Sequence, residues 1–135
     1  MDDVVLYKNI ESLTLKRDKL LRKLRKQVRD YGRGRIRFED LGPTLTELRK
    51  TRKAYLRVVE PPVKVQQKLK DSVVTLMEFT YLVSVNDEAE LLKRIIVLMR
   101  KNGVEQYLIE HVKNDLREVE ELSKLVSEAI TKLQS

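Results

Sequence analysis

Residues 16–37 read KRDKLLRKLRKQVRDYGRGRIR and combine an amphipathic helix with a basic tail. The stretch holds eleven Lys and Arg residues against two acidic ones, so its net charge of +9 exceeds the +7 of the whole chain. At about 100° per residue, its apolar side chains and those just before it fall in one stripe roughly 100° wide. The members of this stripe are Ile10, Leu13, Leu20, Leu21, Leu24, Val28 and Tyr31. The pattern predicts a helix with one face in a core and the other directed to a polyanion, although a basic face can also be merely solvated.

Glycine and proline divide the rest of the chain into helical segments. All seven of them fall in four gaps, at Gly32 and Gly34, Gly42 and Pro43, Pro61 and Pro62, and Gly103. These residues are unfavourable inside helices and favoured at their ends, and no segment between the gaps alternates with period two. The sequence therefore predicts an all-α protein. We expect a single domain over residues 1–135, an antiparallel bundle of four to five helices with long first and last helices and a basic loop or arm after the first helix.

The boundaries of the first two helices follow from these signals. Helix one is expected over about residues 3–31, with Asp2 or Asp3 as its N-cap and Gly32 as its stop. Residues 33–41 form the basic arm. Helix two is expected from Gly42-Pro43-Thr44 to Glu60, before a rigid elbow at Pro61-Pro62.

The second half of the chain predicts three further helices. Helix three, over about residues 62–85, is apolar all round, which indicates either a central position or a side reserved for another subunit. Asn86 and Asp87 are expected to break it, with Asp87 and Glu90 capping helix four over residues 88–101. Helix five, over residues 104–134, has an apolar seam over about four heptads. Its length of about 45 Å matches the roughly 42 Å of helix one, so these two helices are predicted to pair along their lengths.

Charge is distributed unevenly between the two halves of the chain. Residues 1–60 hold 17 Lys and Arg against 9 Asp and Glu, whereas residues 61–135 hold 11 against 12. This asymmetry predicts that the N-terminal half engages a polyanion while the C-terminal half is scaffold. The predicted contact residues are Lys16, Lys19, Arg22, Lys23, Arg25, Lys26, Arg29, Arg33, Arg35, Arg37, Arg49, Lys50, Lys53 and Arg57.

The sequence offers little chemistry for catalysis. Cysteine is absent and His111 is the single histidine, so thiol nucleophiles and the common Cys and His metal sites are excluded. Gly32 and Gly34 are not completed by a third glycine, and His111, although near Glu110 and Asp115, has no accompanying nucleophile. We expect a non-enzymatic protein without metal, cofactor or small-molecule substrate.

Two arginines interrupt otherwise apolar stripes, Arg17 in helix one and Arg52 in helix two. Each can pack its stem on the core and pair with a carboxylate, for which Glu78 is the expected partner. Alternatively, both face a ligand groove between helices. The sequence leaves this choice open.

The leading functional hypothesis is an architectural protein that binds nucleic acid with little dependence on base sequence. Duplex DNA is favoured and RNA is possible, because aromatic residues that could stack on single strands are scarce near the basic region. No helix-turn-helix spacing is present, which favours recognition of the backbone with little reading of bases. We also expect the chain to associate into a homo-oligomer through exposed apolar surface on helices three and five. A chromatin-like protein and a viral nucleocapsid subunit both fit this description.

Two alternatives belong to other classes. A basic N-terminal helical hairpin followed by a less basic portion resembles, in charge layout alone, the ESCRT membrane-remodelling family, and this resemblance implies a helical scaffold that assembles on anionic membranes. The other alternative is a helical adaptor whose basic face docks an acidic protein. No apolar run is long enough for a membrane span and the start, Met1-Asp2-Asp3, is not that of a secretory signal, so we expect an intracellular location or one inside a virion. The 36% of charged residues and the lack of Cys and Trp also favour a thermophilic source.

Overall fold

The computed structural model of the chain describes residues 3–60 and 63–135, and these are helical over most of their length. The described residues contain no strand, which confirms the all-α prediction. In chain order the elements are α1 (Asp3–Gly32), the 3-10 turn η1 (Phe38–Leu41), α2 (Gly42–Val59), α3 (Gln67–Phe79), the π-helical segment η2 (Thr80–Ser84), α4 (Val85–Lys101) and α5 (Gln106–Gln134).

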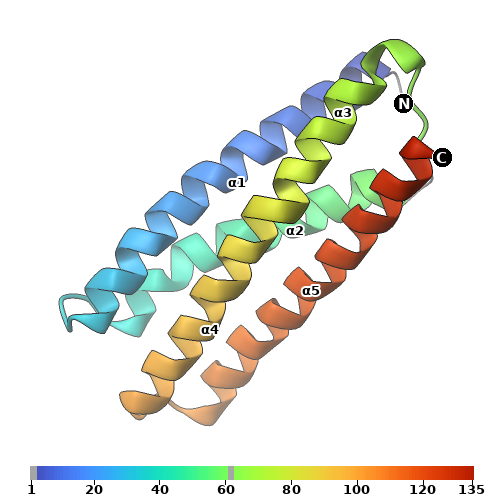
Figure 1. The fold of residues 1–135 in the computed structure, drawn as a ribbon. Coiled ribbons are helices and arrows are strands. Elements are labelled where there is room, and N and C mark those ends of the chain that lie inside the picture. The colour runs from blue at the N-terminus through green and yellow to red at the C-terminus, as the bar shows by residue number, and fades with distance from the viewer. Residues whose placement is uncertain (1–2, 61–62) are drawn as a thin grey trace.

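The helices form an elongated antiparallel bundle (Figure 1). Helix α2 runs back along α1, α3 to α4 form a third rod, and α5 returns along it. α1 packs against α2, α3 and α4, whereas α5 packs against α4, α2 and α3. The long first and last helices therefore lie on opposite sides of the bundle, and the predicted pairing of helix one with helix five is wrong: equal length did not decide the neighbours.

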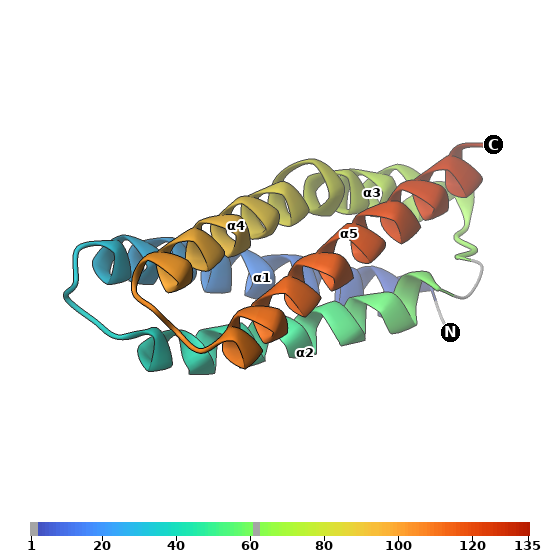
Figure 2. The same cartoon turned by 90° about the horizontal axis from the view of Figure 1, so that it is seen from below.

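Two connections lie together at one end of the bundle, which we call the loop end (Figure 2). They are residues 33–37, which join α1 to η1, and residues 102–105, which join α4 to α5. The first connection turns at Gly34, whose φ of 71° favours glycine, and α1 ends as predicted near Gly32. The second turns at Gly103, with φ 68°, at one of the four predicted gaps between helices.

The predicted break at Asn86 and Asp87 is absent, because α3, η2 and α4 follow one another without interruption. Within η2 the backbone N–H of Val85 donates to the carbonyl of Thr80, five residues earlier, which is the π pattern. Asp87 lies inside α4 and pairs with Arg25 instead of capping a helix. Helix three begins later than predicted, at Gln67. The predicted cap at Asp2 and the elbow at Pro61-Pro62 lie outside the described residues.

The core follows the apolar stripes predicted for α1, α2 and α5. Leu21, Leu24 and Val28 of α1 are buried, and the buried apolar side chains of all the long helices form one cluster. α3 and η2 differ: Val73, Val74 and Met77 are buried, while an outward face leaves three large apolar side chains exposed. These are Phe79, Leu82 and Val83.

A network of buried ion pairs crosses the centre of this core. Arg17 of α1 donates to Glu88 of α4 at 2.5 Å, and its other N–H groups reach the hydroxyls of Ser84 and Thr51. Arg52 of α2 donates to the second oxygen of Glu88 at 2.7 Å and to Asp115 of α5 at 2.6 Å. Both arginines therefore pair in the core, and neither faces a ligand groove.

The edge of the network reaches solvent. Arg49 binds both oxygens of Asp115 at 2.7 Å, and Arg52 also reaches the half-buried Glu118 at 2.9 Å. Burial alone would lower the pKa of Arg52, but the charges of Glu88 and Asp115 and the hydrogen bond that Arg52 donates to Glu118 outweigh burial and raise that pKa. The hydrogen bond to Asp115 likewise raises the pKa of Arg49. Arg49 and Arg52 thus stay charged at the edge of the network, where they contact Asp115 and Glu118.

The carboxylate predicted to pair with the buried arginines was Glu78, and this prediction is wrong. Glu78 is half-buried on α3, and no ion pair within the described residues involves it. Glu88 and Asp115 take its place because they lie on the inward stripes of α4 and α5, between Val85 and Leu92 and between Val112 and Val119.

Candidate nucleic-acid interface

Four arginines line one groove between the C-terminal part of α1 and α4. Arg25, Arg29 and Arg33 come from α1 and the residue that follows it, and Arg94 comes from α4. Val28 and Leu91 contribute apolar surface to the groove, which has a volume of about 410 Å³. We call these four residues and the space between them the arginine groove.

The end of α1 packs against α4 at Gly32. A Cβ atom placed on Gly32 would lie 3.6 Å from Cδ1 of Leu98 and 3.9 Å from Nη2 of Arg94. The guanidinium of Arg94 therefore lies directly beside the last turn of α1, next to the arginines that this turn presents. Cations from two distant parts of the sequence meet at this point.

Few carboxylates neutralise the groove. Arg25 pairs with Asp87 at 3.0 Å, but both side chains are substantially exposed, and such surface pairs contribute at most about 1 kcal/mol. Within residues 3–60 and 63–135, no ion pair involves Arg29, Arg33 or Arg94. Among the described residues, three of the four arginines in the groove therefore have no carboxylate partner, and the fourth has an exposed surface pair.

The loop end extends this positive surface. Arg33, Arg35 and Arg37 are exposed on the connection between α1 and η1, while Ile36 and Phe38 are half-buried and anchor it to the core. This matches the predicted basic arm. Lys101 of α4 lies seven residues after Arg94, on the same side of the helix, and is exposed near the loop.

The remaining predicted contact residues fall into three groups. Lys19, Lys23 and Lys26 are exposed on α1, and Lys53 is exposed on α2. Lys16 and Lys50 both pair with Glu47, and Arg22 pairs with Asp18 four residues earlier, so these three cations are partly neutralised. Arg57 lines a separate groove between α1 and α2, towards the other end of the bundle.

Arg49 needs a correction, because it is committed to Asp115 at the edge of the buried network. Its Nε and Nη2 atoms both bind this carboxylate, and little of the side chain remains for another anion. Sequence reasoning missed Arg94 and Lys101, which lie in the half predicted to be scaffold. The signal was their spacing: Asp87, Leu91, Arg94, Leu98 and Lys101 recur at intervals of four and three along one face of α4.

The structure gives no support to the proton-transfer pair that His111 could have formed. His111 is exposed on α5 and lies edge-on to the ring of Tyr107, at 6.4 Å between centroids. Asp115 is buried in the ion network, and the pKa of Glu110 is lowered by its hydrogen bonds from Lys113 and Gln106. Among the described residues, no cluster of acidic and histidine side chains could hold a metal ion.

Comparison with protein-family models, with curated proteins and with solved structures finds no match to this chain. Within the described parts, no helix combines the length and the apolar character needed to cross a bilayer. Any functional assignment therefore depends on the charge and geometry of the surface itself.

Proposed function

We propose that this protein binds the phosphate backbone of nucleic acid, duplex DNA in preference to RNA, through the arginine groove and the basic loop end. The observation that carries the proposal is the meeting of Arg29, Arg33 and Arg94 beside one another without carboxylate partners among the described residues. Arginine is suited to this role because its planar guanidinium forms paired hydrogen bonds with phosphate oxygens.

Such contacts would make the binding electrostatic and largely independent of base sequence. Each phosphate contact releases condensed counterions, so the affinity for duplex DNA should fall as salt rises, with a log–log slope of about −0.9 per contact. Contacts to phosphates position a protein on the helix without reading its sequence. This suits an architectural role, in a chromatin-like or nucleocapsid-like assembly.

The same surface favours nucleic acid over a lipid membrane. Segments that lie on membranes place large apolar side chains beside their cations. In the described structure, none of the exposed large apolar residues lines the arginine groove, and Ile36 and Phe38 in the basic loop turn towards the core. The alternatives are a membrane scaffold and an adaptor for an acidic protein, and the experiment below separates them from nucleic-acid binding.

We propose in addition that copies of the chain associate through the exposed apolar face of η2 and its flanks. Phe79, Leu82 and Val83 give this face three large apolar side chains, and Leu82 is 59% exposed. Sedimentation equilibrium of the wild type and of a Leu82→Lys variant tests this. A monomeric wild type at all concentrations would contradict it.

The binding proposal is tested with three ligands at matched salt: a duplex DNA, a single-stranded RNA and vesicles that contain an anionic phospholipid. The test variant combines Arg29→Glu, Arg33→Glu and Arg94→Glu. The matched control combines Lys68→Glu, Lys124→Glu and Lys132→Glu, which change the net charge equally at exposed positions away from the groove.

We expect the wild type and the control to bind duplex DNA most tightly, and the test variant to lose at least 100-fold in affinity while its thermal unfolding is unchanged. An equal loss in both variants would show that net charge, and not the groove, determines binding. Preference for the vesicles would support the membrane scaffold, and binding to none of the three would support the adaptor.

A further inference from the structure

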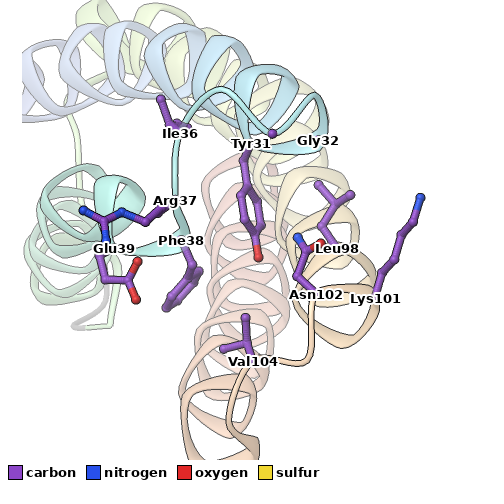
Figure 3. Close-up of a pocket in the computed structure, with 11 residues that line it drawn as sticks. Tyr31, Gly32, Ile36, Arg37, Phe38, Glu39, Leu98, Lys101, Asn102 and Val104 are labelled. Carbon is purple, nitrogen blue, oxygen red and sulfur yellow. The ribbon is translucent and has the colours of Figure 1, made fainter.

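A second cavity lies at the loop end, between the connection that follows α1 and the end of α4 (Figure 3). It has a volume of about 410 Å³, within the range of sites that hold small molecules or parts of larger ones. Tyr31, Phe38, Leu98 and Val104 give it a largely apolar interior. We call it the tyrosine cavity.

The hydroxyl of Tyr31 is the unusual group of this cavity. Tyr31 is only 5% exposed, and its hydroxyl oxygen is buried without a hydrogen-bond partner among the described residues. A buried hydroxyl normally finds a partner, because leaving it unpaired loses the hydrogen bonds that it makes in water. In Figure 3 the hydroxyl points to the space between Phe38, Asn102 and Val104. A ligand in this space would supply the missing partner.

The other groups around the cavity define the chemistry of that ligand. The ring of Phe38 lies at 6.4 Å from that of Tyr31, tilted by 54°, so one aromatic face borders the space. Asn102 provides an amide that both donates and accepts hydrogen bonds. The charged residues that line the cavity are Arg37, Glu39 and Lys101, and the charged ends of Arg37 and Lys101 point away from the centre (Figure 3). The interior therefore suits an uncharged, flat, heteroaromatic ring with polar edges. Any anionic groups of the same ligand would lie outside the cavity, near the charged ends of Arg37 and Lys101.

We propose that the tyrosine cavity takes an unpaired nucleobase of the bound nucleic acid. The inference rests on the proposed function and extends it, because Gly32 is shared by this cavity and the arginine groove. Phosphates in the groove and on the basic loop would hold a strand at the mouth of the cavity. The base would stack on Phe38 and hydrogen-bond to Tyr31 and Asn102, so the protein selects distorted or unpaired sites in place of a base sequence.

Ile36 and Phe38, both half-buried, line the side of the cavity opposite α4. Ile36 belongs to the connection after α1, between the exposed Arg35 and Arg37, and Phe38 begins η1, whereas Leu98 and Asn102 belong to α4 and the turn directly after it. Because the Tyr31 hydroxyl is itself buried, its contact with a base requires the side chains around it to rearrange.

The test uses 2-aminopurine as the probe, placed as a single bulged base in a short DNA duplex, with the same duplex fully paired as reference. Its fluorescence reports stacking on an aromatic ring. Free 2-aminopurine riboside is a third ligand, which separates recognition of a strand from recognition of a nucleoside. The variants are Tyr31→Phe, Phe38→Leu and Tyr55→Phe, the last being a control because Tyr55 is fully buried in the core and does not line the cavity.

We expect the wild type and Tyr55→Phe to bind the bulged duplex about tenfold more tightly than the paired one, with quenched probe fluorescence, in line with the effect of one stacked base. Tyr31→Phe should lose most of this preference and Phe38→Leu should lose the quenching, while both keep their affinity for the paired duplex. Saturation by the riboside alone would assign the cavity to free nucleosides and overturn the strand proposal.

Equal affinity for the two duplexes in the wild type, without a fluorescence change, overturns the base site but leaves backbone binding intact. Failure to bind the paired duplex at low salt overturns the proposed function, and with it this inference. Tyr31→Phe removes one unpartnered oxygen from the core, so it should fold, and thermal unfolding of each variant verifies this.

Discussion

Arg52 of α2 donates a hydrogen bond of 2.7 Å to Glu88 of α4 although both side chains are buried and 36 positions separate them in the chain. Since Arg17 binds the other oxygen of the same carboxylate, Glu88 joins three helices at one point. Buried ion pairs of this kind add little net stability compared with apolar packing, but removing one partner leaves a charge without compensation.

The first prediction concerns that carboxylate. Glu88→Gln keeps the shape of the side chain but removes the charge that two buried arginines share, so the free energy of unfolding should fall by about 3–5 kcal/mol. Urea unfolding followed by circular dichroism measures it. The control is Glu78→Gln, which should change stability by less than about 0.5 kcal/mol. Similar losses in both variants would show that Glu88 has no special role.

The second prediction concerns coupling between Arg17 and Glu88. Replacing both with Met leaves Arg52 paired with Asp115 and Glu118 and removes both ends of one ion pair. The free energy of unfolding of the double variant should therefore be about 1–3 kcal/mol higher than the sum of the losses in Arg17→Met and Glu88→Met predicts. Additive losses in a double-mutant cycle would contradict a direct interaction.

The third prediction concerns the π segment η2. A π turn carries one residue more than an α turn, so deletion of the exposed Leu82 should convert η2 to a regular α turn and preserve the register of α3 and α4. We expect this variant to fold, with a melting temperature within about 8 °C of the wild type. Deletion of Val97, equally exposed but inside the regular helix α4, should abolish cooperative unfolding. If deletion of Leu82 destabilised the protein more than deletion of Val97, the extra residue of η2 would be required for the register of α3 against α4, and this prediction would be wrong.

The fourth prediction concerns pH. Burial raises the pKa of Tyr55 from its ordinary 10 to about 12. Because the phenol ionises more readily in the unfolded chain, this residue contributes nothing to pH dependence below pH 10 and lowers stability as pH rises from 10 to 12. At pH 11 the loss is about 1.4 kcal/mol. Tyr55→Phe should remove this part of the alkaline destabilisation, which urea unfolding at pH 8 and pH 11 measures. An identical pH dependence in both proteins would contradict it.

Much of the fold could be predicted from the sequence because its apolar stripes are regular and its breaks are marked by glycine. The stripes of α1 and α5 and the turns at Gly34 and Gly103 are examples. The prediction of a break at Asp87 was wrong, because an acidic residue three positions before Glu90 can either cap a helix or form an ion pair with another helix. Only the position of α1 beside α4 distinguishes the two.

The buried network and half of the arginine groove needed the packing of the helices. Arg17 and Arg52 were visible as charges on apolar stripes, and Glu88 and Asp115 have the same signature in the second half of the chain. Matching two misplaced cations with two misplaced anions would have found the network. Arg94 could not be joined to Arg29 and Arg33 in this way, because which helices are neighbours is a tertiary property.

The salt dependence of duplex DNA binding tests the central claim most directly, when the wild type is compared with a variant that combines Arg29→Gln, Arg33→Gln and Arg94→Gln. We predict a log–log slope of about −5 or steeper for the wild type, and a slope less steep by about 2 to 3 for the variant, since three phosphate contacts are removed. The control with Lys68, Lys124 and Lys132 replaced by Gln should keep the wild-type slope. A wild-type slope near zero, or an unchanged slope in the arginine variant, would contradict the claim that this groove binds phosphates.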